Sequence, residues 1–561
     1  MTKYIVDTKA INLSQKEFLA SGGFGSVYVK SDTAYKIYTD PANMIPIGKF
    51  QELSVLDHPS IIKPEKIILD EHSKNVGYTM KFVDDNYVLC QLFTKIFKEK
   101  NNIDAQTTLN LVRKLQDIVQ YIHSKHILVV DLNEMNFLVS KKFDNIYAID
   151  VDSYQTSSFP APAIMDSIRD RKVKHNQFTE LSDWYSFAIL AFNLWILIHP
   201  YRGRHPKIKD WNERIEKDIS VFDPQVSLPG SCEPFNIIPE AYLNWFKAVF
   251  SGKRLPPPKD LQTIVNIITT IKKVLGSNIF EIKELLEAKE QINNIIYTNN
   301  QVYITKSGLS YINNRQSLQV SPKAEIIILP KSNTVIAGYI ENKKLILKNL
   351  SNQTDISCDL FISDIMVNDN RFYIKDKTSI YEIKFIEIGN KLLVSTNPVV
   401  QILEFASKLF PGTCIQNLLG ATYASFFPKE GTHNQLQLKE LNGYKIIDAK
   451  HERRILIVNA AKSGIYHRFI FKFDSTYSNY TVRVKNNITL TDVNFTVLDN
   501  GICAHLNDEE KLELFVVSNS SNDIKEIEDS TVLSGDMKLM SYGTQVMFTK
   551  NNKLYSLKMV K

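Results

Sequence analysis

The stretch that decides the fold of the N-terminal half runs from Asp131 to Asp152 and reads DLNEMNFLVSKKFDNIYAIDVD. Asp131 and Asn136 lie five positions apart in a predicted loop between a helix and an apolar strand, and Asp150 directly follows the next apolar strand. Phosphoryl transfer requires one carboxylate that orients a hydroxyl, together with an amide and a second carboxylate that hold Mg²⁺. We therefore predict that Asp131 is a catalytic residue and that Asn136 and Asp150 are metal ligands.

A glycine-rich turn, SGGFGSVY at residues 21–28, precedes this stretch. Glycines allow the tip of a hairpin to approach a triphosphate closely, so that backbone N–H groups meet its oxygens. Taken alone, such a motif more often marks only a tight turn. With the motifs that follow, it predicts a nucleotide-binding loop, whose candidate contacts are Gly22, Gly23, Phe24, Gly25 and Val27.

Lys36 lies in an apolar strand, within the sequence AYKI at residues 34–37. A lysine that points from such a strand into a cleft needs a carboxylate partner or an anion. Glu52, on a predicted helix 16 residues later, could supply the carboxylate. We therefore predict a catalytic Lys36–Glu52 pair that holds the ammonium group ready for the phosphate oxygens of a nucleotide.

In their order and spacing these motifs resemble the catalytic domain of protein kinases, over about residues 15–255. The resemblance implies a bilobal α+β fold in which Lys36 contacts ATP, Glu52 is its partner and Met80 lies at the nucleotide-binding hinge. It also implies that Asp183 is a buried anchor of the C-terminal lobe. The implied reaction is transfer of the γ-phosphoryl group of Mg-ATP to a protein Ser or Thr hydroxyl, with ATP and Mg²⁺ as cofactors.

One branch of the family is particularly similar. The segments DLNEMNFLV and AIDVDSYQ resemble the DLNPSN and IDVDSFQ-like motifs of bacterial and phage kinases of the tellurite-resistance-associated type. In that branch an Asn also stands two positions after the catalytic Asp, where most protein kinases have a Lys. Asn133 brings no charge to that position, and losing such a group can cost about 10²–10³ in rate.

Two further departures from the family pattern concern regulation and metal binding. Val130 replaces the Arg that normally receives a phosphate from the activation loop, so we expect activity without phosphorylation of that loop. Val151 and Asp152 replace the Phe and Gly that usually follow the metal-binding Asp150. Asp152 could bind metal, but we expect a solvated or backbone-capping side chain, because Asp commonly bonds to local backbone.

From about residue 280 the sequence changes to short runs rich in Val, Ile, Tyr and Phe, separated by turn residues. Seven hairpin-like units recur at loose intervals of roughly 30–50 residues, which is typical of β-propeller blades. We predict a kinase-like domain over 1–260, a linker over 261–280 and an all-β domain, a β-propeller of about seven blades, over 281–561. A β-sandwich pair or another repeated sheet is the alternative.

The β half shows no cluster of acid, base and nucleophile. Its histidines are separated and are expected to be surface or hydrogen-bonded groups: His433, His451, His467 and His505. We therefore expect this half to bind a protein partner or substrate and to add no chemistry. Residues 1–275 alone should then keep basal ATP turnover, provided that truncation bares no large apolar interface.

Composition excludes several other classes. The chain has 561 residues with 67 basic and 61 acidic side chains, which disfavours a dedicated nucleic-acid binder. Five cysteines without a CxxC pair argue against a disulfide framework or a Cys-based zinc site. No secretory h-region begins the chain, and the most apolar run, residues 187–198, is too short to span a bilayer. We expect a cytoplasmic protein that binds neither membrane nor nucleic acid.

Three functions remain open from the sequence. The first is an active Ser/Thr-type protein kinase that uses Mg-ATP and acts on an unknown protein substrate. The second is a pseudokinase scaffold that binds nucleotide while the β domain recruits partners, as the changes at Asn133, Val151 and Asp152 would allow. The third is a kinase-fold enzyme that acts on a small molecule or transfers AMP.

Overall fold

The computed structural model describes residues 2–22, 24–258, 277–298, 300–389, 391–517 and 524–560. Gly23 and residues 261–276 of the predicted linker therefore lie outside the described residues.

The N-terminal half begins with a seven-stranded antiparallel sheet in the order β2-β1-β6-β7-β5-β4-β3. Its strands are β1 (Thr2–Val6), β2 (Lys9–Leu13), β3 (Phe18–Ser21), β4 (Gly25–Lys30), β5 (Thr33–Tyr38), β6 (Lys66–Leu69) and β7 (Asn75–Lys81). Glycine is required where β4 and β7 approach β5, because a Cβ on Gly25 or Gly77 would collide with the backbone of β5. Helix α1 (Ile47–Leu53) contacts the short helix η4 (Val151–Ser153).

A mainly helical layer follows. It consists of α2 (Lys95–Lys100), α3 (Ala105–His123), α4 (Glu180–Ile196), α5 (Trp211–Glu216) and α6 (Glu240–Phe250), with a small sheet of β8 (Asn86–Val88), β9 (Phe137–Ser140) and β10 (Ile146–Ala148) and the 3₁₀ helix η3 (Leu89–Phe93). The apolar run at 187–198 is buried in this layer: α4 packs against α3 and α6, and nearly all of its side chains are inaccessible. Among the described residues, no helix is long and apolar enough to cross a membrane.

The C-terminal half consists of seven four-stranded antiparallel sheets. Six of them follow the chain in order: β12 (Ile292–Tyr297), β13 (Gln301–Thr305), β14 (Leu309–Ile312), β15 (Arg315–Gln319); β16 (Glu325–Ile328), β17 (Val335–Glu341), β18 (Lys344–Asn349), β19 (Thr354–Ile356); β20 (Asp364–Asn368), β21 (Arg371–Lys375), β22 (Ser379–Ile388), β23 (Lys391–Gln401); β24 (Ser407–Phe410), β25 (Thr413–Leu418), β26 (Ala421–Phe426), β27 (Asn434–Gln437); β28 (Lys445–Glu452), β29 (Ile455–Lys462), β30 (Ile465–Phe473), β31 (Tyr480–Asn486); and β32 (Phe495–Val497), β33 (Ile502–Leu506), β34 (Leu512–Val516), β35 (Lys525–Ile527).

The seventh sheet joins the two ends of this half. Strand β11 (Phe280–Glu287) pairs antiparallel with β38 (Lys553–Met559), which continues through β37 (Gln545–Lys550) to β36 (Lys538–Tyr542). Closure of this kind covers the edges that an open repeat would expose. The all-β region is therefore propeller-like, with the predicted number of repeated sheets, and the alternative of a sandwich pair is wrong.

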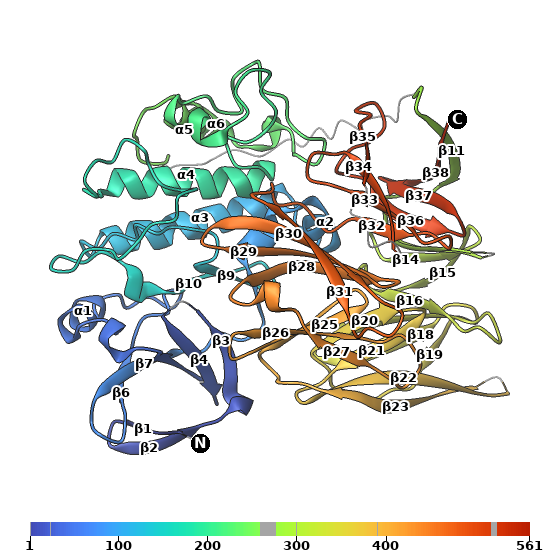
Figure 1. The fold of residues 1–561 in the computed structure, drawn as a ribbon, viewed down its shortest axis with the longest axis horizontal. Helices are drawn as coiled ribbons and strands as arrows, with labels where there is room; N and C mark the ends of the chain where they lie inside the picture. The colour runs from blue at the N-terminus through green and yellow to red at the C-terminus, as the bar shows by residue number, and fades with distance from the viewer. Residues whose placement is uncertain are drawn as a thin grey trace.

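The two halves share a continuous core. Ile447, Ala461 and Leu490 of the C-terminal half belong to the same buried cluster as the side chains of α3 and α4. Figure 1 shows β28 and β29 beside β9 and α3. The rings of Phe82 and Phe405 meet edge to face at 5.5 Å between centroids. Residues 1–275 were expected to keep ATP turnover alone only if truncation exposed no large apolar interface. Truncation would expose this one, so that condition is not met.

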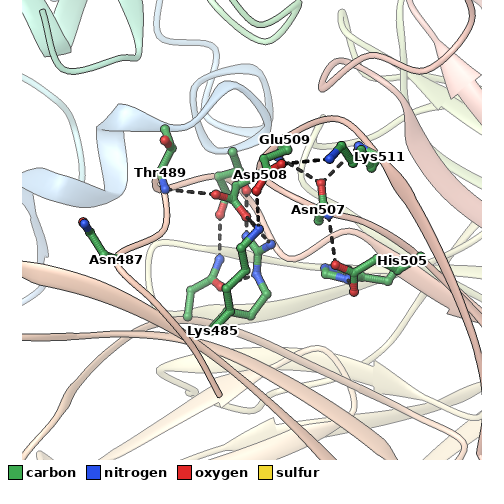
Figure 2. Close-up of polar contacts among 12 residues, drawn as sticks. Lys485, Asn487, Thr489, His505, Asn507, Asp508, Glu509 and Lys511 are labelled. Carbon is green, nitrogen blue, oxygen red and sulfur yellow. Dashed lines mark hydrogen bonds and ion pairs between the residues drawn. The ribbon is translucent and has the colours of Figure 1, made fainter. Parts of the chain in front are cut away.

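A buried polar network holds the sheet β28–β31 against β32–β35 (Figure 2). Arg468 donates to Asn459 at 2.9 Å and to Asp508 at 3.2 Å, and its side chain is almost inaccessible. The Asp508 carboxylate also accepts the backbone N–H of Thr489 at 3.2 Å and pairs with Lys485 at 3.3 Å. Buried charges of this kind are tolerated only when their partners are fully placed.

Three of the four histidines of the C-terminal half have a hydrogen-bond partner. His451 bonds to the hydroxyl of Tyr477 at 3.0 Å, and His505 to the carboxylate of Glu513 at 3.1 Å. His467 bonds to the side chain of Asn486 at 2.7 Å. His433 is exposed, so the prediction that the four are surface or hydrogen-bonded groups is confirmed.

Candidate functional site

Asp183, near the start of α4, holds the loop that carries the predicted catalytic residue. Its buried carboxylate accepts the backbone N–H groups of Val129 at 2.8 Å and Val130 at 2.9 Å, and lies 2.9 Å from Nε2 of His123. Val130 has a φ of 61°, which is costly for a β-branched residue. The two hydrogen bonds to Asp183 hold the chain in this conformation, and the prediction that Asp183 is a buried anchor is confirmed.

Asp131 lies in a dense set of hydrogen bonds. Its carboxylate accepts the backbone N–H of Met165 at 2.8 Å and the amide of Asn133 at 2.9 Å. Asn136 donates to the backbone carbonyl of Asp131 at 3.0 Å. Burial raises the pKa of Asp131, and the bonds from Met165, Asn133 and Asn136 oppose that rise.

Asn133 has a structural reason to be an amide. Its side chain donates to Asp131 and accepts the backbone N–H of Met135 at 2.8 Å, while only 2% of the residue is exposed. Only a group with both a donor and an acceptor can make these two bonds. A lysine at this buried position could donate to Asp131, but it would leave the N–H of Met135 unsatisfied.

Lys36 makes the central ion pairs of the site. Its ammonium lies 2.9 Å from Oδ1 of Asp150 and 2.7 Å from Oδ2 of Asp152. The hydroxyl of Tyr38 donates to the same oxygen of Asp152 at 2.6 Å. The rings of Tyr38 and Tyr78 each lie 5.6 Å from the ammonium. These contacts connect the sheet of the N-terminal half to the loop after β10.

The ionisation of the three charged groups follows from this arrangement. Burial alone would raise the pKa of Asp152, but Lys36 and the tyrosine hydroxyls lower it. Burial and the neighbouring charge of Asp152 raise the pKa of Asp150, although Lys36 opposes them. Burial disfavours the charge of Lys36, but the two carboxylates outweigh it and raise the pKa of Lys36. The cluster thus has one cation shared between two acids.

The predicted partner of Lys36 is corrected by this geometry. Among the described residues, Glu52 makes no ion pair with Lys36; its carboxylate accepts the backbone N–H of Ser158 at 3.2 Å. Asp152 is the residue that sequence reasoning misjudged, because it is buried and ion-paired instead of solvated or backbone-capping. The sequence feature that could have indicated this role is its position two residues after Asp150, just beyond an apolar strand.

The nucleotide-loop candidates are only partly brought together. Val27 lies opposite Lys36 in the β4–β5 register, and Met80 lies opposite Ala34, so these three side chains share one face of the sheet. The N–H of Gly22 donates to the carbonyl of Gly25 at 2.8 Å. Phe24 is 56% exposed. Gly23 lies outside the described residues.

The donor set suits Mg²⁺. Asp150 is half exposed at 48% of its side chain, so it can accept a further ligand. Oδ1 of the buried Asp152 has no hydrogen-bond partner among the described residues. Mg²⁺ prefers oxygen ligands and binds through one or two carboxylates, with waters and substrate phosphates completing its shell. No group of three or more His, Cys, Asp or Glu side chains in the described part of the chain could hold a metal by itself.

Comparison with known proteins adds nothing to this geometry. No protein-family model matches the chain, and the search of curated proteins gave no match.

Proposed function

We propose that the chain is a protein kinase of the Ser/Thr type, related to the tellurite-resistance-associated branch, which transfers the γ-phosphoryl group of Mg-ATP to a protein hydroxyl. The observation that carries the proposal is the pairing of Lys36 with Asp150 and Asp152. Lys36 shares one face of the sheet with Val27 and Met80. The loop of Asp150 is joined to that of Asp131, because the N–H of Ile149 donates to the carbonyl of Asn136 at 2.9 Å. A cation paired with two acids, together with the half-buried carboxylate of Asp131, supplies the groups that phosphoryl transfer uses.

Each residue has a role in this proposal. Asp150 and Asn136 would hold Mg²⁺, which neutralises phosphate charge when bound. Lys36 would give up one of its two ion pairs, with Asp150 or Asp152, and would contact the phosphate oxygens instead. Asp131 would accept the proton of the attacking hydroxyl as the bond to the γ-phosphorus forms and the bond to ADP breaks. The raised pKa of Asp131 suits a group that must take up this proton near neutral pH.

Met165 adds a condition to the reaction. Its backbone N–H donates to Oδ1 of Asp131 at 2.8 Å, where it competes with a substrate hydroxyl for that oxygen. In the proposed cycle this bond is exchanged for one from the substrate. The proposed cycle therefore includes a shift of the segment that carries Met165.

The same bond favours the second function, a pseudokinase scaffold that binds nucleotide without transfer. In that case Met165 would stay on Asp131, and the propeller-like ring would act as a partner-binding module. A ring of this kind offers a rigid surface for another protein. We also propose a cytoplasmic location, with no membrane or nucleic-acid partner, from the near balance of basic and acidic side chains and from five cysteines that contain no CxxC pair.

An assay with γ-labelled ATP and Mg²⁺ on the full chain separates these functions. The wild type is compared with Asp150→Ala and with Asp117→Ala, an exposed acid on α3, as matched control. Transfer to the chain itself or to an added protein, lost in Asp150→Ala and kept in Asp117→Ala, supports the kinase. Nucleotide binding by the wild type without any transfer supports the scaffold, and absence of both contradicts the two proposals together.

A further inference from the structure

The first residue of β28, Lys445, reaches from the C-terminal half to the loop of the candidate site. Its ammonium donates to the backbone carbonyl of Met135 at 3.4 Å, one residue before the predicted metal ligand Asn136. Strand β30 of the same sheet also holds this loop, because the hydroxyl of Tyr466 donates to Glu134 at 2.5 Å. The C-terminal half thus places a cation directly on the loop 131–136.

A third contact fixes this arrangement. Gly464, in the turn between β29 and β30, lies against the side chain of Met165, which a Cβ at this glycine would strike. Met165 in turn donates to Asp131. The β29–β30 hairpin therefore packs on the segment that covers the predicted catalytic carboxylate, and Lys445 on the adjacent strand is held beside it.

The candidate site needs a further cation. Asp131, Glu134, Asp150 and Asp152 bring four carboxylates to it, whereas Lys36 is shared between two of them. Asn133 is committed to its two buried hydrogen bonds. A nucleotide triphosphate brings additional negative charge, which must be met by positive groups.

Lys445 is available for this purpose. In the part of the chain that the structure describes, no carboxylate lies within ion-pair distance of its ammonium. Burial lowers the pKa of Lys445, while the charges of Cys90, Asp150 and Glu134 oppose that change. The side chain of Lys445 keeps contact with solvent, so its ammonium can move from the carbonyl of Met135 to a phosphate oxygen.

We propose that Lys445 contacts the phosphate groups of the bound nucleotide and that the nucleotide site is completed by the C-terminal half. This inference rests on the proposed function, and it replaces the expectation that the β half adds nothing to the site. Lys445 would exchange its bond to the carbonyl of Met135 for a phosphate oxygen, without any covalent step. The competing role is purely structural: Lys445 would only hold the C-terminal half against the loop 131–136.

Calorimetric titration of the full chain tests the inference with two probes, Mg-ATP and adenosine, which lacks phosphate. The variants are Lys445→Met, Lys445→Arg, Lys36→Met and Lys408→Met. Lys408 is the matched control: it is an exposed lysine of the C-terminal half, as Lys445 is, but its acidic neighbours are Asp448 and Asp364 instead of Asp150 and Glu134. Thermal unfolding of each variant shows that the fold is kept.

We expect Lys445→Met to weaken Mg-ATP binding at least about tenfold, as loss of a charge-assisted hydrogen bond does. Adenosine affinity should stay within about twofold, Lys445→Arg should recover most of the loss, and Lys408→Met should match the wild type. Unchanged Mg-ATP affinity in Lys445→Met, or an equal loss for adenosine, overturns the inference. If Lys36→Met is weakened while Lys445→Met is not, the proposed function stands and this inference falls; a wild type that binds no Mg-ATP overturns both.

Discussion

The ammonium group of Lys36 lies 2.7 Å from the carboxylate of Asp152, a residue 116 positions later in the chain. This contact, with the neighbouring bond to Asp150, is the main polar link between the N-terminal sheet and the loop after β10. Lys36 and Asp152 are both largely buried, so their charges interact strongly and each depends on the other.

Removing the cation should therefore destabilise the protein even without nucleotide. In Lys36→Met, Asp150 and Asp152 become neighbouring acids that have lost the cation they share, and we expect a loss of about 3 kcal/mol in unfolding free energy. Lys30→Met, at the exposed end of β4, should change stability by less than about 0.5 kcal/mol. Chemical denaturation measures both. Equal stability of the two variants would mean that the cluster contributes nothing to the fold.

The anchor of the catalytic loop gives a second prediction. Asp183→Asn replaces one acceptor oxygen by a donor, so at least one of the bonds from His123, Val129 and Val130 is lost in a buried site. We expect a loss of about 2 to 4 kcal/mol and a lower thermal midpoint. The control is Asp166→Asn, an exposed acid that pairs with Arg171. A midpoint for Asp183→Asn as high as that of the control contradicts the anchor role.

The contact between the halves should depend on pH through Asp492. Its carboxylate accepts the hydroxyl of Thr94 at 2.7 Å and the N–H of Ile96 at 3.0 Å, and burial, helped by the charge of Asp448, raises its pKa to about 7. A folded-state pKa above the ordinary 3.8 means that the folded protein binds the proton more tightly. The contribution of Asp492 to stability is therefore present at low pH and lost as pH rises toward 7.

Asp492→Asn tests this pH dependence, because an amide can donate to Thr94 and accept from Ile96 without carrying charge. We expect the variant to be more stable than the wild type at pH 8, by roughly 3 kcal/mol, and close to it at pH 4. Thermal midpoints of both proteins across this range give the comparison. A difference that does not change with pH would show that Asp492 ionises normally in the folded chain.

Turnover should not depend on phosphorylation of the segment after Asp152. The buried Val130 occupies the position of a phosphate-receiving Arg, and its apolar side chain cannot bind a phosphate. We expect the double variant Ser157→Ala/Ser158→Ala, whose two residues are exposed, to keep the wild-type rate within about twofold. Phosphatase treatment of the wild type before assay should have equally little effect. A specific loss of turnover in a folded variant would contradict this reading of Val130.

The sequence predicted the elements of the fold better than the pairing of the site. Alternation and turn residues were sufficient for the strands and for the number of repeated sheets, because those patterns are local. The choice between Glu52 and Asp152 as the partner of Lys36 depends on how α1 lies against the sheet, which no local pattern specifies. The expectation for Asp152 was wrong because Asp side chains commonly bond to local backbone, whereas this one is buried and paired with Lys36.

The role of the C-terminal half at the site was beyond sequence reasoning for a different reason. Lys445 meets Met135 across 310 positions of the chain, and one lysine among many in a strand-rich region carries no signal of that contact. From the sequence, Asn133 shows only the loss of a charged group. Its two hydrogen bonds, to Asp131 and to the N–H of Met135, became visible only with the loop in place.

The central claim is that the cleft around Lys36 and Asp150 holds Mg-ATP, and calorimetric titration of ATP into the full chain with and without Mg²⁺ tests it most directly. We predict one nucleotide bound per chain in Mg²⁺, weaker binding without the metal, and an affinity for Mg-ATP at least about tenfold lower in Lys36→Met. No binding by the wild type, or the same affinity in Lys36→Met with and without Mg²⁺, would contradict the account.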